Sequence, residues 1–334
     1  MDEARAPASA LPAGKLPKLA IVILNFRTPR LVNDCLDSLR DQVGPGVAVL
    51  VVDNASNDGS PASIRAFLQQ RSYGWARVVE SPVNGGFAAG NNVGIRAIDA
   101  NAYLLLNSDT IVRPGAVEKL CQALEDYPTA GLIVPRTESL DGRFDRNAFV
   151  TPRPISEFVR GAKIGVFSRL LRRFDVIAEL PTTSFEPEWV GFCAVVIRRA
   201  VIDQVGLLDE RFFMYYEDVD YCMRVREAGF SIRYCPEARV VHLLGGSSGL
   251  TSANGVEKRA ARYLYEARAR FFAKHYGRPG LVAANVAFSA GYAVSRARSL
   301  VTKKTAGHRE REPLDVWINT WAPFRPYTHP GGRS

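Results

Sequence analysis

The sequence lacks the features that would assign it quickly to several common classes of protein. Its five cysteines are scattered and show none of the short spacings of a zinc site, so we expect buried, reduced thiols. Residues 1–17 have neither the basic start nor the apolar core of a signal peptide, and we expect a disordered tail. The uncharged segment 279–295 is slightly shorter than the roughly 20 apolar residues that a membrane-spanning helix needs.

Acidic and basic side chains balance over most of the chain, and the net charge of +9 comes from one region near the C-terminus. Residues 256–312 contain 13 Lys and Arg and 4 Glu. Such an excess suits a nucleic acid, an anionic lipid or a partner that carries a diphosphate, or it is a solvated basic helix face. No nucleic-acid recognition motif accompanies it, so we do not expect nucleic-acid binding. The segment 279–295 has basic residues on both sides and fits a helix at a membrane surface or a helix that packs on the core.

Continuous apolar segments that end in polar side chains alternate with helical patterns in the first third of the chain. The apolar segments are 19–26, 47–54 and 102–107, and the helical patterns cover 29–41, 60–70 and 90–99. Such apolar segments are typical of strands buried on both faces, as in a parallel sheet. The alternation predicts a doubly wound α/β sheet, and 334 residues suffice for one large domain or two modest ones.

Polar side chains follow each of these predicted strands. They are Asn25, Asp53 and the run Asn107, Ser108 and Asp109. Because ligands bind at the carboxyl ends of the strands in such sheets, we expect these side chains to share one ligand site. A single Asp at the end of a strand is also a common turn former, so the convergence of three strand ends is what favours a site.

A loop rich in glycine and asparagine precedes the third helical pattern and contains Asn84, Gly85, Gly86, Phe87 and Asn91. Glycines let a backbone approach a ligand closely, and helix N-termini attract phosphate. The glycine spacing matches neither the dinucleotide-binding fingerprint nor the phosphate-binding P-loop. An NAD-dependent dehydrogenase is therefore disfavoured, although the fold class would permit it.

Three carboxyl groups, those of Glu217, Asp218 and Asp220, follow a cluster of aromatic residues that ends at Tyr216. The helical pattern that they begin stops at Gly229, so the acids lie at a helix N-terminus, where the helix dipole favours negative charge. That preference accounts for one or two of the acids. Aromatic rings beside a carboxylate also make a partly dry site, which can convert the carboxylate into a general base.

Together, these segments resemble the family 2 inverting glycosyltransferases with the GT-A fold, over about residues 18–250. Within that family they look most like the bacterial rhamnosyltransferases. Each segment is weak evidence alone, and their order and spacing make the joint match specific. The matching segments are Asp53–Ser60, Asn84–Asn92, Asn107–Thr110, Trp189–Gly191, Asp209–Phe213 and Tyr216–Asp220.

The resemblance implies a Rossmann-like, doubly wound mixed sheet with a helical C-terminal extension. It divides the chain into a nucleotide-binding half at 18–135, an acceptor half at 136–250 and a basic helical extension at 251–334 that is a candidate for membrane association. Beyond residue 150, patterns predict helices at 155–180 and 257–276, one strand at 189–197, and two short strands at 232–235 and 239–242.

The resemblance also assigns roles in binding the donor. Asp53 would accept a hydrogen bond from a pyrimidine ring, and Asp109 would hold Mg²⁺ or Mn²⁺ at the diphosphate, with His242 as a second contact. Asn107 stands where the family usually has the first Asp of its Asp-x-Asp motif, so this site carries one negative charge fewer. The remaining contacts to the nucleotide sugar would come from Asn25, Asn84, Gly85, Gly86, Phe87, Asn91, Asn107 and Ser108.

On the acceptor side, the resemblance makes Asp218 the catalytic base with Glu217 beside it, and Trp189, Gly191 and Tyr216 would contact the acceptor. The implied reaction is the inverting transfer of a sugar to a hydroxyl of a glycan or of a polyprenyl-diphosphate-linked acceptor in cell-surface polysaccharide synthesis. Rhamnose from dTDP-rhamnose is the sugar that we expect.

Several alternatives fit the same residues. The donor could be another UDP- or dTDP-sugar, such as one of galactofuranose or N-acetylglucosamine. A nucleotidyltransferase of related fold and a non-catalytic carbohydrate-binding scaffold are the alternative functions. A lipid-linked acceptor implies a cytoplasmic protein that is peripheral at the cytoplasmic face of the inner membrane, with its basic extension toward an anionic membrane surface.

Overall fold

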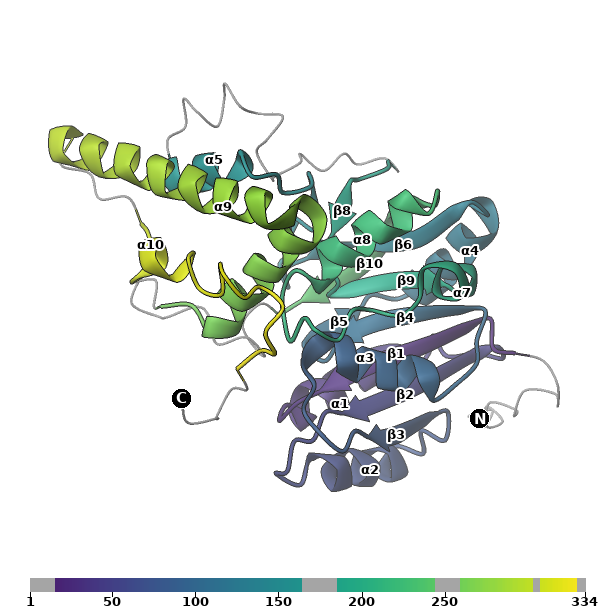
Figure 1. Cartoon of the computed structure of the whole chain (residues 1–334). Helices are drawn as coiled ribbons and strands as arrows, with labels where there is room; N and C mark the ends of the chain where they lie inside the picture. Colours follow the sequence, from purple (N-terminus) through teal and green to yellow (C-terminus); the bar gives the residue numbers. More distant parts are fainter. Residues whose placement is uncertain (1–15, 164–184, 244–258, 303–306, 329–334) are drawn as a thin grey trace.

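The computed structural model describes residues 16–163, 185–243, 259–302 and 307–328, and it shows a sheet between helices with a helical region at one side (Figure 1). The expected disordered tail falls almost entirely outside these residues.

The elements in the first half of the chain are β1 Leu19–Asn25, α1 Pro29–Leu39, β2 Val47–Asp53, α2 Ser60–Gln70, β3 Ala76–Glu80, α3 Gly86–Arg96, β4 Ala102–Asn107, β5 Thr110–Val112, α4 Ala116–Asp126 and β6 Ala130–Glu138. Those that follow are β7 Ala148–Phe149, α5 Ser156–Ala162, β8 Trp189–Val190, β9 Ala194–Arg198, α7 Arg199–Val205, α8 Glu217–Glu227, β10 Ser231–His242, α9 Arg262–Thr302 and α10 Glu312–Asp315.

The main sheet has eight strands in the order β3-β2-β1-β4-β9-β6-β10-β5. Strands β3, β2, β1 and β4 are parallel, whereas β9 runs antiparallel to both β4 and β6. This mixed sheet confirms the predicted α/β fold with a Rossmann-like half. Because Asn25, Asp53 and Asn107 end three adjacent parallel strands, they lie at one edge of the sheet.

Alternate residues of the central strands pack against helices on opposite faces of the sheet, as expected for strands that are buried on both sides. One apolar core joins β1 and β2 to α1, α2 and α4, and a second joins the other face of the sheet to α3, α7 and α8. The five cysteines are free, in agreement with the reduced thiols expected, and three of them are buried.

Several predicted element boundaries are wrong. Helix α3 begins at Gly86 rather than at residue 90, so Phe87 and Asn91 lie on a helix. The strand predicted at 189–197 is divided into β8 and β9, and the two short strands at 232–235 and 239–242 form one strand, β10, with an irregularity after Cys235. The helix predicted over 155–180 ends at Ala162, and residues 164–184 lie outside the described part of the chain.

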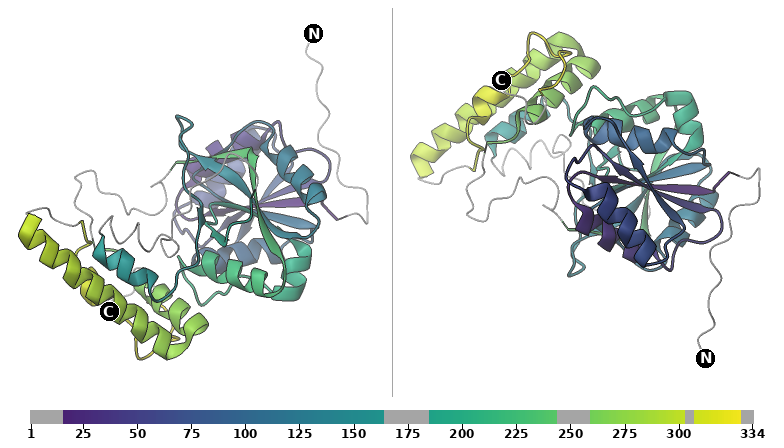
Figure 2. Two further views of the ribbon diagram at one scale, coloured as in Figure 1. Left: turned by 90° about the horizontal axis from the view of Figure 1, so that it is seen from above. Right: turned by 90° about the horizontal axis from the view of Figure 1, so that it is seen from below.

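The C-terminal region is built on α9, which begins at residue 262 and is interrupted at Gly277, where φ is 69°. Its first part packs beside α8, where Phe271 and Ala267 contact Phe212 and Val219. Its second part lies along α5, and the two helices project together from the sheet domain (Figure 2). None of the helices in the described ranges is long and apolar enough to cross a bilayer.

Candidate active site

The carboxylate of Asp53 is held rigidly where β2 ends. Asn25 Nδ2 and Ser56 Oγ each donate to Asp53 Oδ1 over 2.6 Å, and the Ser56 backbone N–H donates to Oδ2 over 3.0 Å. All three side chains are buried. Asn25 and Asp53, which were predicted to share one ligand site, are thus in direct contact. Sequence analysis missed Ser56, which holds the carboxylate from the following turn.

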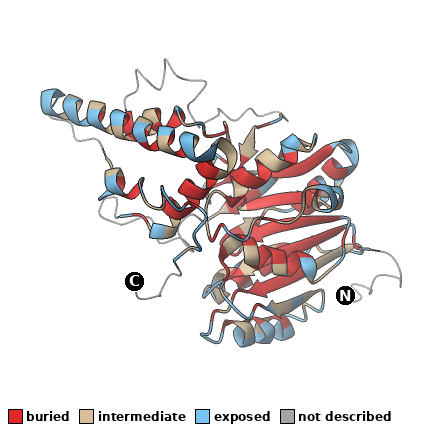
Figure 3. Cartoon of the chain, in the orientation of Figure 1, coloured by how far each residue is buried: buried red, intermediate tan, exposed pale blue. Residues whose placement is uncertain are grey.

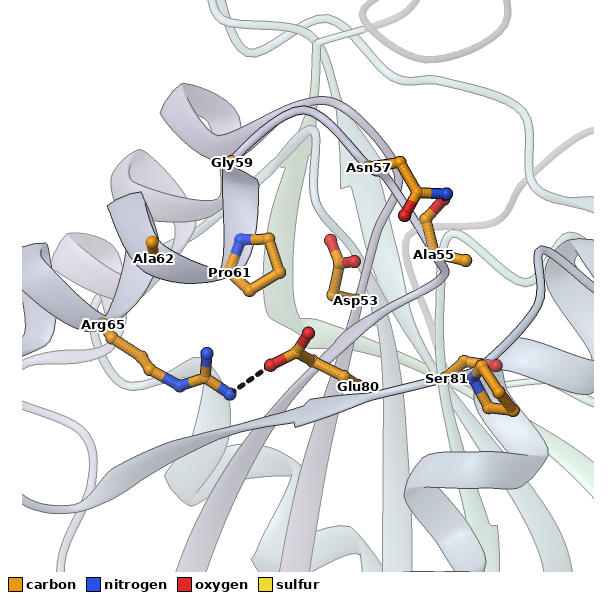
Figure 4. A pocket seen from close by; sticks show the side chains of 10 residues that line it. Asp53, Ala55, Asn57, Gly59, Pro61, Ala62, Arg65, Glu80 and Ser81 are labelled. Atoms are coloured by element: carbon orange, nitrogen blue, oxygen red, sulfur yellow. Dashed lines mark hydrogen bonds and ion pairs between the residues drawn. The ribbon is translucent and has the colours of Figure 1, made fainter.

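A cavity of about 590 Å³ opens beside Asp53, between the start of α2 and the end of β3 (Figure 4). Pro61 and Ala62 supply apolar contact, while Arg65 and Glu80 form an ion pair of 2.6 Å across its wall. The volume lies within the range of small-molecule sites and is sufficient for a nucleoside. Arg65 and Glu80 were not predicted, because only the pairing of β2 with β3 brings α2 and residue 80 together.

The loop at Asn84 is joined by its backbone to the aromatic segment before Asp218. Asn84 Oδ1 accepts hydrogen bonds from Asn54 Nδ2 and the Gly86 N–H, so its side chain closes the turn. The Phe87 N–H donates to the Phe213 carbonyl over 2.7 Å. At Gly86 φ is +81°, and a Cβ there would lie 1.8 Å from the Phe213 oxygen, so this approach requires glycine.

Two further predicted residues of this region have structural partners. Asn91 Nδ2 donates to the carbonyl of Phe87 one turn earlier on α3, over 3.0 Å. Ser108 Oγ and Thr28 Oγ1 lie 3.0 Å apart, which links the ends of β4 and β1. The Asn107 N–H bonds to the carbonyl of Cys193, on the antiparallel strand.

Asp109 and His242, the two residues predicted from sequence to contact a metal ion, lie close together. The Asp109 side chain is 1% exposed, and its Oδ1 lies 3.5 Å from His242 Nε2, at the end of β10. Within the described ranges, no three His, Cys, Asp or Glu side chains gather as a metal cage. One carboxylate and one imidazole still suit a divalent cation that takes its other ligands from substrate phosphates and water, as Mg²⁺ usually does.

The carboxyl groups of Glu217 and Asp218 begin α8 in an environment that opposes their ionisation. Burial raises the pKa of Asp218 to about 7, although the Val219 N–H donates to its Oδ1 over 2.8 Å. Burial and the negative charge of Asp218 raise the pKa of Glu217 well above its ordinary value. A carboxyl group that titrates near neutral pH is suited to act as a general base.

Asp220 lies two residues further along α8 and has the opposite electrostatic behaviour. Its fully buried carboxylate contacts His275 Nε2 at 2.8 Å, Lys274 Nζ at 2.6 Å and Arg224 Nε at 3.0 Å. Burial alone would raise its pKa, but the hydrogen bond from His275 and the two cations lower it. This cluster ties α8 to α9, and sequence analysis missed it because Lys274 and His275 lie more than 50 residues away.

The three predicted acceptor residues lie on β8, directly after β8 and directly before α8. The Trp189 ring stacks on Phe149 with centroids 4.4 Å apart, and its Nε1 donates to the Val150 carbonyl. The Tyr216 ring lies 5.3 Å from that of Phe271, and at Gly191 an added Cβ would meet the Phe149 ring only at 4.0 Å. The roles of these residues in binding an acceptor stay predictions.

The predicted residues thus form four connected groups: Asn25 with Asp53, Ser108 with the end of β1, Asp109 with His242, and the Gly86 turn with the aromatic segment. None of these contacts joins Asp218 to Asp53 or Asp109. A single cleft shared by the three carboxyl groups therefore stays a prediction.

Sequence comparison identifies relatives of known activity. The family described as glycosyl transferase family 2 matches residues 20–180. The chain is 30% identical over 224 residues to the N-acetylglucosaminyl-diphospho-decaprenol L-rhamnosyltransferase of Mycobacterium tuberculosis, covering 62% of this chain and 70% of that protein. It is 26% identical over 235 residues to the low-salt glycan biosynthesis hexosyltransferase Agl10 of Haloferax volcanii, covering 68% and 67%.

Structural comparison finds the same fold in solved structures. The mannosyltransferase PcManGT from Pyrobaculum calidifontis, solved in complex with GDP-Man and Mn²⁺, matches with a TM-score of 0.52 at 15% identity. The match covers 94% of this chain and 87% of that one. At this identity the likeness establishes a shared GT-A-like fold.

Proposed function

This chain belongs to glycosyl transferase family 2, and we propose that it transfers rhamnose from dTDP-rhamnose to a lipid-linked glycan acceptor with inversion at the anomeric carbon. That it is a glycosyltransferase follows from the family. The similarity to an L-rhamnosyltransferase supports the choice of donor. The observation that supports the proposed mechanism is the position of Asp218 at the start of α8, where burial raises its pKa to about 7.

The donor binds at the carboxyl ends of β1, β2 and β4. The pyrimidine ring enters the cavity beside Asp53, whose carboxylate accepts a hydrogen bond from the ring N–H. The bonds from Asn25 and Ser56 keep that carboxylate in place before the donor arrives. The diphosphate extends toward Asp109 and His242, which would hold Mg²⁺ or Mn²⁺. When bound, this cation supplies positive charge to the leaving diphosphate.

The acceptor hydroxyl loses its proton to the Asp218 carboxylate as its oxygen attacks the anomeric carbon. The bond from that carbon to the diphosphate oxygen breaks, and the negative charge leaves with the nucleoside diphosphate. Because attack comes from the face opposite the leaving group, one displacement inverts the anomeric centre. Burial and the negative charge of Asp218 raise the pKa of the neighbouring Glu217, which favours its protonated form while Asp218 is ionised.

We place the reaction at the cytoplasmic face of the inner membrane. The relative from Mycobacterium tuberculosis is named for an acceptor that carries a polyprenyl diphosphate, and an acceptor of that class resides in a membrane. The basic C-terminal extension favours a location at an anionic surface.

A donor screen tests this function directly. The purified protein is mixed with Mg²⁺ or Mn²⁺, an N-acetylglucosaminyl-diphospho-polyprenol acceptor and a panel of dTDP- and UDP-sugars, and release of the nucleoside diphosphate is measured. We expect dTDP-rhamnose to be consumed fastest, and EDTA to slow the reaction.

The other possible outcomes of these assays each support one of the alternative functions or donors. Faster release of UDP from a galactofuranose or N-acetylglucosamine donor assigns a different sugar. Release of pyrophosphate when a nucleoside triphosphate and a sugar 1-phosphate replace the nucleotide sugar identifies a nucleotidyltransferase. Binding of donors without any turnover identifies a carbohydrate-binding scaffold.

A further inference from the structure

The second half of α9 presents an uninterrupted apolar face to solvent. Its exposed residues recur every three or four positions and therefore lie along one side of the helix. Val286 is 52% exposed, Leu300 is 81% exposed and Val301 is 84% exposed. We call this set the outer face of α9; its members are Ala283, Val286, Ala290, Ala293, Ala297, Leu300 and Val301.

The buried side of the same helix contains the polar residues that a surface helix normally turns outward. Asn285 and Ser295 are completely buried, and Asn285 accepts a hydrogen bond from the buried Arg268 over 2.6 Å. Gly291 on α9 packs directly on the backbone of α5, since an added Cβ would lie 2.3 Å from the Phe158 carbonyl oxygen. Leu281 and Phe288 are also completely buried, so the helix is anchored through apolar as well as polar side chains. The opposite side of the helix is exposed along its length (Figure 3), and the residues exposed there are largely apolar.

A tryptophan and two arginine side chains lie beside this outer face. Trp317 Nε1 contacts Ser289 Oγ at 3.3 Å, which places one indole along the border of the face. Arg278 and Arg296 are exposed and fall on the same side of the helix as Ser289 at about 100° per residue. Indole rings and basic side chains around an apolar helix face are typical of helices that lie in a membrane interface.

We propose that the outer face of α9, with Trp317 at its border, binds the surface of an anionic lipid bilayer. This inference deepens the proposed function, on which it rests for its biological role. A second copy of the chain is the other occupant to consider. Two such faces brought together would place arginines of like charge near one another in a protein of net charge +9, whereas anionic headgroups neutralise them.

Vesicle co-sedimentation of the full chain, without donor or acceptor, tests the proposal. Vesicles of phosphatidylcholine alone are compared with vesicles that also contain phosphatidylglycerol. We expect binding to the anionic vesicles, weakened by salt. The double variant Val286→Glu, Ala293→Glu should lower the partition coefficient about tenfold or more, because binding scales with the apolar area buried in the interface.

A matched control carries the same change of charge on α2, with Ala66→Glu and Gln69→Glu at exposed positions that do not line the cavity. We expect it to bind vesicles nearly as well as the unaltered protein. Should the double α9 variant fail to fold, the single change Val286→Glu at a half-exposed position of the same face provides the comparison. Equal binding by the α9 and α2 variants, or a dimer in solution that the α9 changes dissociate, overturns the proposal. Because no sugar transfer is measured, these outcomes are independent of the donor screen.

Discussion

The carboxyl groups on the two sides of the candidate site lie in different electrostatic environments. On the donor side, Asp53 is buried among neutral hydrogen-bond donors from neighbouring strand ends. On the other side, Asp218 and Asp220 are separated by one residue, yet burial raises the pKa of Asp218 to about 7 while three basic groups lower that of Asp220. The comparison teaches that cationic partners, rather than position in the sequence, decide which acid is ready to accept a proton.

The largest expected effect comes from removing the proton acceptor. Asp218→Asn should reduce the turnover number about 10³-fold, within the usual range for a general base. Binding of the donor should survive, because the donor contacts belong to β1, β2 and β4. Turnover and donor affinity are measured separately, by dTDP release and by calorimetry. Unchanged turnover would remove Asp218 as the base.

The pH dependence should follow the same carboxyl group. Because the pKa of Asp218 is about 7, kcat/KM should fall about tenfold for each pH unit below 7, in proportion to the ionised fraction. An acid limb with its midpoint near pH 4 would contradict this assignment.

The stability of the protein should change over the same pH window. The folded protein binds this proton more tightly than the unfolded chain, whose Asp titrates near pH 4. The contribution to stability is therefore full below about pH 4 and is lost as the pH rises to about 7. Asp218→Asn should remove this loss, so thermal melts above pH 7 should show the variant several degrees more stable than the unaltered protein.

Asp220, whose carboxylate is paired with basic side chains, should contribute chiefly to the free energy of unfolding. Asp220→Asn leaves three basic groups around a neutral amide and should lower the free energy of unfolding by about 3 kcal/mol, as breaking a buried ion pair does. The control is Asp203→Asn, which breaks the exposed pair of Asp203 with Arg199 and should lower it by less than about 1 kcal/mol. Urea unfolding measures both, and equal losses would mean that the Asp220 cluster does not hold α8 to α9.

The close contact between Gly86 and Phe213, which joins the two sides, should also affect the free energy of unfolding. Gly86→Ala places a Cβ against the Phe213 carbonyl and should lower the free energy of unfolding by about 3 kcal/mol at most, as overpacking does. Gly115 has a similar φ of +80° and open space around it, so Gly115→Ala isolates the backbone strain of about 1 kcal/mol. A smaller loss at Gly86 than at Gly115, in urea unfolding, would show that this close approach is not rigid.

The parallel half of the sheet and its strand-end residues were predictable because their signals are local. A continuous apolar strand and the polar residue that ends it can be recognised without knowing the neighbours, as for Asn25 and Asp53. The same locality explains the errors. Pro236 interrupts the strand pattern, but pairing with β6 and then with β5 carries β10 across that interruption. Gly86 looked like part of a loop, yet the backbone bond from Phe87 to Phe213 holds the first turn of α3.

The amino-acid sequence by itself determined the alternation of strands and helices, the family and the identity of the candidate acids, because each depends on residues that are close together in the chain. The tertiary structure decided the rest. Lys274 and His275 reach Asp220 from α9, and neither approaches Asp218 in the same way. Packing on α5 likewise leaves a largely apolar side of α9 exposed. Charge state and exposure depend on which distant elements cover a side chain, and only the folded chain brings those elements together.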